Sequence, residues 1–206
     1  EKKAQEKKEL WETYDFLMGQ GESLIYRQKF PEAFRTYVEV YAHVARYEPL
    51  LHLTPRDLDT IYANIIYAAV WARMFKETHR WLEEGIQWAS KNKESKRTRI
   101  SIAYVYGVRR QFDLAQQEIE KITKENPDDQ EAFLRKAEIY SWNKQYEKSR
   151  EAYKRCQELN PTDPLFRLRY SEILLAQYRE EKNPAHLEEA ISNLEKMLLD
   201  DPWSDF

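Results

Sequence analysis

Histidine and cysteine are the residue types that most often catalyse reactions or hold metals, and this sequence contains only four histidines and one cysteine. His43, His52, His79 and His186 lie far apart, and none begins a metal-ligand spacing such as HExxH, so no zinc site is predicted. Cys156 has no second cysteine to pair with and lies in no Cys-His signature. We therefore interpret it as a small buried hydrophobic residue.

Paired carboxylates and glycine-rich loops are the next candidates for chemistry. The pairs Glu83-Glu84 and Glu188-Glu189 cannot converge on one substrate, because adjacent helical residues point about 100° apart. The chain has four scattered glycines, which cannot form a phosphate-binding loop. Since no catalytic set emerges, we predict that the protein is not an enzyme and needs no cofactor or metal.

The charge distribution gives little support to nucleic-acid binding. There are 33 basic and 36 acidic residues, a net charge of −3, so the chain as a whole does not attract phosphate. The basic run Lys91, Lys93, Lys96, Arg97 and Arg99 is interrupted by Glu94. We interpret it as a solvated loop surface, because such runs usually are.

The sequence does not define a compartment. Its densest apolar run, Ile61 to Val70, is too short to cross a bilayer, so no membrane span is predicted. A single cysteine says little about redox environment, which leaves both the cytoplasm and the bacterial periplasm open. The first residue, Glu1, is not methionine, and we expect the chain to be a fragment of a longer protein.

The strongest signal is a repeat of 34 residues. At that offset seven positions agree in size or chemistry: Ala103 with Ala137, Tyr106 with Tyr140, Phe112 with Tyr146, Ala115 with Ser149, Ile119 with Tyr153, Ile122 with Cys156, and Pro127 with Pro161. Small residues, Gly21 among them, would let two helix backbones approach closely, and the aromatic residues would fill the groove between neighbouring hairpins.

This pattern resembles the tetratricopeptide repeat (TPR), a 34-residue helical hairpin. Residues 130–163 match best, with Phe133, Ala137, Tyr140, Ser149, Tyr153 and Asn160-Pro161 at the family's positions. Further units are placed at 14–48, 59–92, 96–129 and 164–202. The resemblance implies an all-α fold: a right-handed α-solenoid of antiparallel hairpins with about ten helices, forming a single array over residues 1–206.

The prolines agree with these boundaries, since a proline inside a helix removes a hydrogen bond and clashes with the preceding turn. All eight are expected at helix ends, as where Thr54 and Pro55 begin a helix. Two irregular segments are expected to be long loops, Glu48 to Leu53 between the first two units and Arg179 to Asn183 inside the fifth.

The resemblance also implies a binding surface. In this family the first helix of each hairpin lines a concave groove in which peptides lie. The corresponding residues here are Met18, Glu22 and Ile25, then Ala63, Tyr67 and Val70, then Ile100, Tyr104 and Val108, then Leu134, Glu138 and Ser141, and finally Leu168, Glu172 and Leu175.

These residues are mostly apolar, with aromatic and acidic members. Family members that grip a terminal carboxylate place Lys and Asn or Arg on these faces, whereas Met18, Glu22, Leu134 and Glu138 stand here, so such a clamp is not expected. We predict an interaction scaffold whose groove binds a protein or peptide segment with apolar and basic side chains. The alternative is a periplasmic TPR module of a bacterial envelope machine, such as polysaccharide export or outer-membrane assembly.

Two further surfaces follow from the helix assignments. Trp81 and Trp88 lie on one helix face and are expected in the core, whereas Trp71 and Trp142 are expected to be more exposed.

The last helix carries four apolar residues: Ile191, Leu194, Leu198 and Leu199. We expect this surface to be covered by another repeat, another domain or a second copy of the chain. The last would give self-association through residues 187–206, unless Trp203 and Phe206 fold back over the surface.

Overall fold

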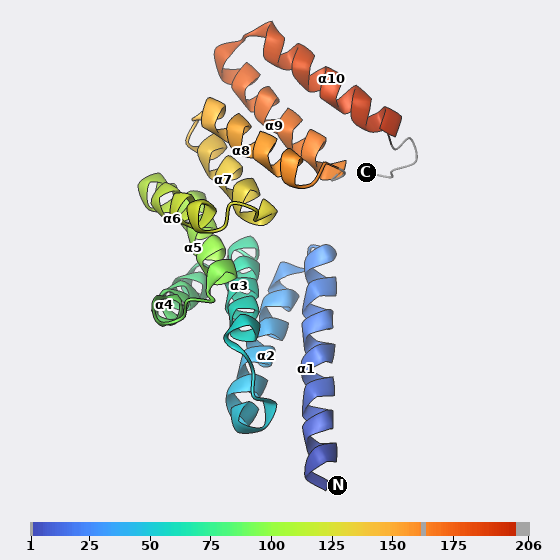
Figure 1. The fold of residues 1–206 in the computed structure, drawn as a ribbon, viewed down its shortest axis with the longest axis vertical. Coiled ribbons are helices and arrows are strands. Elements are labelled where there is room, and N and C mark those ends of the chain that lie inside the picture. Colours follow the sequence, from blue (N-terminus) through green and yellow to red (C-terminus); the bar gives the residue numbers. More distant parts are fainter. Residues whose placement is uncertain (1, 162–163, 201–206) are drawn as a thin grey trace. The chain divides into compact units, whose positions relative to one another are not determined.

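The computed structural model describes residues 2–161 and 164–200, and every regular element within them is a helix (Figure 1). The predicted all-α class is therefore confirmed. The helices are α1 (Lys2–Tyr26), α2 (Phe30–Leu51), α3 (Pro55–Trp71), α4 (Phe75–Lys91), α5 (Lys96–Val108), α6 (Phe112–Glu125), α7 (Gln130–Trp142), α8 (Tyr146–Leu159), α9 (Pro164–Glu181) and α10 (Pro184–Asp200).

Helices that follow one another in sequence pack together as hairpins, as α1 does with α2, α7 with α8, and α9 with α10. The chain divides into an N-terminal unit, Glu1–Val105, and a C-terminal unit, Tyr106–Phe206. Within the N-terminal unit α2 packs on α3, and within the C-terminal unit α6 packs on α7 and α8 on α9. Within each unit, neighbouring hairpins thus pack against one another.

The small residues of the repeat occupy the tightest contacts. Ala103 and Ala137 are fully buried, and Ser149, at a position where the family has alanine, is also fully buried. Its hydroxyl donates to the carbonyl oxygen of Ala137 at 2.7 Å, which satisfies a polar group that would otherwise be costly to bury. Cys156, the single cysteine, is buried as predicted.

Gly21 allows α1 and α2 to approach. A Cβ atom placed on it would lie 2.6 Å from the ring of Tyr37, a ring that is almost completely buried. Gly19, two residues earlier on the same helix, has no neighbouring atom within 4 Å of such a Cβ. Of the two glycines of α1, only Gly21 is therefore required by packing.

Each first helix ends in a short turn through a residue with positive φ. These residues are Gln28, Arg73, Arg110, Lys144 and Lys182, with φ between 56° and 61°. In the α3–α4 turn, for example, the N–H of Met74 donates to the carbonyl of Ala69 at 3.0 Å, the hydrogen bond that closes a helix in a Schellman motif. These turns allow α3 and α4 to be joined by only three residues.

The expected long loop from Glu48 to Leu53 is wrong, because α2 continues through Pro49 to Leu51. The helix bends at Tyr47, with φ −119° and ψ 16°, and a local bend is how a helix accommodates an interior proline. Leu51 is almost completely buried, so the added turn is fixed to the core. Pro49 is thus an exception to the rule that prolines mark helix ends.

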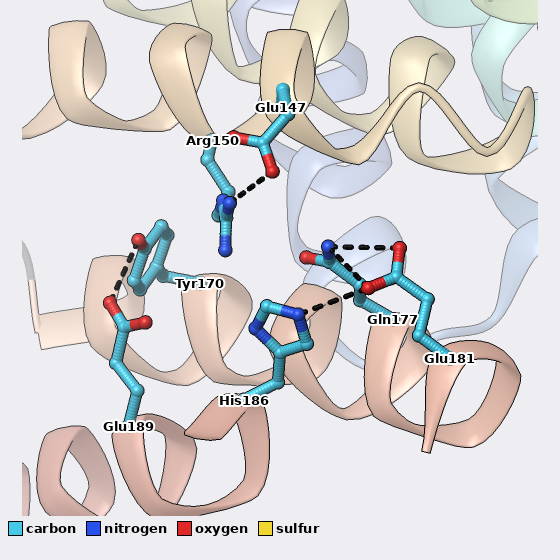
Figure 2. A network of polar contacts seen from close by, with 7 residues as sticks. All are labelled: Glu147, Arg150, Tyr170, Gln177, Glu181, His186 and Glu189. Atoms are coloured by element: carbon cyan, nitrogen blue, oxygen red, sulfur yellow. Dashed lines mark hydrogen bonds and ion pairs between the residues drawn. The ribbon is translucent and has the colours of Figure 1, made fainter. Parts of the chain in front are cut away.

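The expected long turn from Arg179 to Asn183 is also wrong, because α9 extends to Glu181 and only two residues separate it from α10. Figure 2 shows the contacts that hold this extra length. The Gln177 amide donates to both oxygens of Glu181 at 3.1 Å, and the His186 ring lies 3.1 Å from the same carboxylate. The end of α9 is thereby joined to the first turn of α10.

Other contacts in Figure 2 join the hairpin of α9 and α10 internally. The Tyr170 hydroxyl donates to Glu189 at 3.1 Å, and burial together with this carboxylate raises the pKa of the phenol to about 12. Nearby on α8, the Arg150 guanidinium pairs with Glu147. These charged groups satisfy one another, so we assign the network a structural role.

The two glycines of α1 provide a test of the packing. Gly21→Ala should lower the free energy of unfolding by about 1 kcal/mol, because the Tyr37 ring must move to admit the methyl group. Gly19→Ala is the matched control and should raise it by about 0.5–1 kcal/mol, since alanine is the better helix former where space is open. Urea denaturation of both variants measures the difference, and equal effects would contradict the assigned helix contact.

Candidate functional site

The residues predicted to line a groove differ in accessibility in the N-terminal unit. Glu22 is exposed, and Met18, Ile25, Tyr67 and Val70 are half-buried. Ala63, Ile100 and Tyr104 are buried. Because they are buried, Ala63, Ile100 and Tyr104 offer little surface to a ligand.

The contact between α3 and α5 explains this burial. The Ser101 hydroxyl donates to the Ala63 carbonyl at 3.3 Å, and the Thr98 hydroxyl donates to the Asp59 carbonyl at 3.1 Å. Short side chains bonded directly to the opposite backbone hold the two helices close together. Sequence patterns identified the helices but not this spacing.

Four aromatic rings from three helices form a cluster in the N-terminal unit. Phe30 at the start of α2 stacks on Trp71 at the end of α3, with ring centres 5.6 Å apart. Tyr67 lies 6.1 Å from Trp71 and 6.0 Å from Tyr104. Trp71 remains 46% exposed, which confirms its predicted exposure, but its pairing with Phe30 from another hairpin could not be read from the sequence.

The N-terminus of α5 is closed by a buried carboxylate. Asp59 of α3 accepts hydrogen bonds from the backbone N–H groups of Arg97 and Thr98, each at 2.8 Å. A helix N-terminus is otherwise a favourable site for an anion. Because Asp59 already fills this position, the basic run at residues 91–99 does not present these amides to a phosphate group.

In the C-terminal unit the predicted groove residues lie on α7 and α9, apart from Val108 at the exposed end of α5. Glu172 is exposed, and the other members are half-buried. Leu134 and Leu175 pack against the core cluster that contains Ala137 and Leu174. These half-buried leucines are held by the core while part of their surface remains open, so covering them would cost little side-chain entropy.

Glu138, on this surface, is not a free acidic group. Its two carboxylate oxygens pair with Arg135 at 2.8 Å and with Arg169 at 2.9 Å, and its side chain is only 17% exposed. The three residues together carry one net positive charge. Its assumed role in attracting a basic partner is therefore not supported, and Glu172 is the acidic group that remains exposed on this face.

A separate cavity of about 370 Å³ lies among α6, α7 and α8, lined by Glu120, Phe133, Lys136, Tyr140, Lys148, Glu151 and Ala152. The Tyr140 hydroxyl donates to Glu120, and the ammonium groups of Lys136 and Lys148 lie 5.9 and 5.4 Å from the centre of the Tyr140 ring. Two cations and two carboxylates balance one another here. The lining includes no activated nucleophile.

Within the described part of the chain, no group of three or more His, Cys, Asp or Glu side chains is placed to hold a metal ion. None of the helices between residues 2 and 200 combines the length and the apolar content needed to cross a bilayer.

The exposure of two tryptophans agrees with the prediction from the sequence: Trp142 is 39% exposed and Trp81 is buried.

The exposed apolar residues of α10 form another candidate partner surface. Ile191 and Leu198 are about half exposed and Leu199 is 79% exposed, in agreement with the expectation for this helix. Trp203 and Phe206, which were considered as a cover for it, lie outside the described residues. Leu194 is half-buried.

Comparison with known proteins agrees with this architecture. Residues 130–163 match the family model described as tetratricopeptide repeat. The fold is similar to TTC0263, a thermophilic TPR protein of Thermus thermophilus, with a TM-score of 0.70, 15% identity, and coverage of 93% of each chain. Residues 130–163 are thus a tetratricopeptide repeat, and the chain has the fold of TPR proteins.

Two structures of MamA have a fold similar to that of this chain. MamA 41-end from Desulfovibrio magneticus RS-1 gives a TM-score of 0.57 at 15% identity, over 92% of this chain and 97% of that one. The MamA RS-1 ArsTM double mutant gives 0.53 at 15% identity, over 89% and 96%. A search of curated proteins found no sequence match. At these identities the likeness concerns the fold alone.

The Glu138 ion pairs of the TPR array can be tested by charge reversal. Glu138→Lys should lower the free energy of unfolding by about 1–3 kcal/mol, because it leaves three cations together with no carboxylate between them. Glu172→Lys makes the same change on the same face at an exposed position, and should alter stability by less than about 0.5 kcal/mol. Equal urea midpoints for the two variants would show that the pairs contribute nothing.

Proposed function

We propose that this TPR protein is an interaction scaffold that binds a segment of a partner protein along the first-helix face of its hairpins. TPR proteins in general are protein-interaction scaffolds. The observation that carries the proposal is the surface of α7 and α9 in the C-terminal unit. There Leu134, Leu168 and Leu175 are half-buried and the Glu138 ion pairs hold neighbouring first helices together.

This surface favours a mainly apolar partner segment. Half-buried leucines lose little conformational freedom on binding because packing already restricts them. Glu172 is exposed and makes no ion pair within the described residues, so it can pair with one basic side chain of the ligand. An amphipathic helix or an extended segment with a basic residue meets both conditions.

Peptide selection tests the proposal directly. Peptides selected from a random display library on the purified chain should be apolar with a basic residue. A double variant, Ser141→Arg with Glu172→Lys, should weaken their binding at least about tenfold by blocking the face and reversing its charge. Glu188→Lys on α10 reverses one charge elsewhere, as Glu172→Lys does on this face, and should leave affinity unchanged. Selected peptides that bind all three proteins equally would place binding on another surface.

We also propose that the apolar surface of α10 joins two copies of the chain. Sedimentation velocity over a wide concentration range should then show a rising mass for the wild type and a monomer for Leu198→Glu with Leu199→Glu, since a buried charge opposes association. Phe16→Glu, a similar change at another exposed residue, is the control. A wild-type chain that stays monomeric throughout would exclude this contact.

A further inference from the structure

The residues with positive φ at the hairpin turns are unusual in type. Four of the five are basic: Arg73, Arg110, Lys144 and Lys182. Glycine is the usual residue in this left-handed conformation, because a side chain there is strained. Strained residues that persist at equivalent positions are a reason to look for a function.

One of these turns already binds a carboxylate. The Lys144 ammonium pairs with Glu180 at 2.8 Å, and this contact lowers the pKa of the Glu180 carboxyl group. Tyr146, two residues after Lys144, lies beside the same carboxylate, and burial together with that negative charge raises the pKa of its phenol. A basic residue followed two positions later by an aromatic one is thus a carboxylate-binding turn in this structure.

The same pair occurs in the N-terminal unit without a carboxylate. Arg73 has the positive φ, 57°, and Phe75 follows two positions later with 76% of its surface exposed. Among the described residues no acidic side chain pairs with Arg73. The α3–α4 turn therefore has the elements of the occupied turn but no internal ligand.

The neighbouring α1–α2 turn adds to this surface. Lys29 is exposed and has no ion pair within the described chain, and it directly precedes Phe30, whose ring stacks on Trp71 at 5.6 Å. The stacking brings the two turns together. Two cations, Lys29 and Arg73, thus accompany an aromatic platform whose tryptophan is nearly half exposed.

We propose that these residues, Lys29, Phe30, Trp71, Arg73 and Phe75, form a docking site for an extended acidic segment of a partner protein. A carboxylate of the segment pairs with Arg73, as Glu180 does with Lys144, and an adjacent apolar side chain covers Trp71 and Phe75. Arginine suits this role because its guanidinium can donate two parallel hydrogen bonds to one carboxylate. The charge preference is opposite to that of the α7–α9 face, and the inference does not rest on the function proposed for that face.

A nucleic acid is the weaker candidate for the same surface. The chain carries a net charge of −3, whereas binding to a phosphate backbone depends on several neutralised phosphates. The basic run at residues 91–99 does not extend the anion site, since Asp59 occupies the helix N-terminus there. A single carboxylate next to an apolar residue matches the site more closely.

The variant Arg73→Gly tests the proposed docking site. It is expected to be more stable than the wild type, so weaker binding could not result from unfolding. The probe is a short fluorescein-labelled peptide of alternating glutamate and leucine, measured by fluorescence anisotropy. The variant should bind it about tenfold more weakly, because the charge-assisted hydrogen bonds are lost. Its urea midpoint should rise, since glycine removes the strain of positive φ. Trp71→Ala should also weaken binding.

Arg110→Gly is the matched control. It relieves the same backbone strain at the α5–α6 turn. An aromatic residue, Phe112, also follows Arg110 there, but it is half-buried and Val108 stands in place of Trp71, so this turn lacks the exposed aromatic platform and the variant should keep the wild-type affinity. Equal binding of a peptide with glutamine in place of glutamate would overturn the proposal, as would unchanged affinity in Arg73→Gly. A single-stranded oligothymidylate that binds in an Arg73-dependent manner while the acidic peptide does not would also overturn it in favour of a nucleic-acid surface.

Discussion

The close approach of neighbouring helices at small residues is the contact on which the rest of this structure depends. Where Gly21 meets Tyr37, a single added carbon would collide with a buried ring. Where Ala137 meets Ser149, a hydroxyl bonds directly to the opposing backbone. Both contacts lie within one hairpin and set the distance between its two helices, and hence which side chains of that hairpin remain on the surface.

That spacing has direct consequences for binding. In the N-terminal unit hydrogen bonds join α3 to α5, Ala63 and Ile100 are buried, and an accessible aromatic surface lies instead towards the hairpin turns, at Trp71. In the C-terminal unit the ion pairs of Glu138 join α7 to α9 and leave half-buried leucines beside them. The two units therefore present different chemistry on helices that occupy equivalent places in the repeat.

The hairpin turns show how a repeat can change function without changing fold. A residue with positive φ closes each first helix, and in that left-handed conformation any residue with a Cβ atom is sterically disfavoured relative to glycine. This chain uses basic residues at four of the five positions, which costs some stability and places cations beside aromatic residues. A surface of this kind can vary from one hairpin to the next because it lies outside the contacts that hold the helices together.

The class of fold, the repeat and most helix boundaries could be predicted from the sequence. The 34-residue recurrence of residues such as Ala137, Tyr140 and Tyr153 reflects local helix geometry and the need to bury one face, and both are encoded within each repeat. The helical pattern also correctly predicted that Trp81 is buried and Trp71 is exposed.

The accessibility of the expected groove residues and the pairing of their charges could be learned from the folded structure alone. Glu138 is neutralised by Arg169 from the next hairpin, and Trp71 stacks on Phe30 from the previous one. The continuation of α2 through Pro49 likewise depends on the burial of Leu51. The length of α9 depends on the contact of Glu181 with His186. These contacts join residues that lie up to several tens of positions apart in sequence. The pattern of a single repeat cannot predict them.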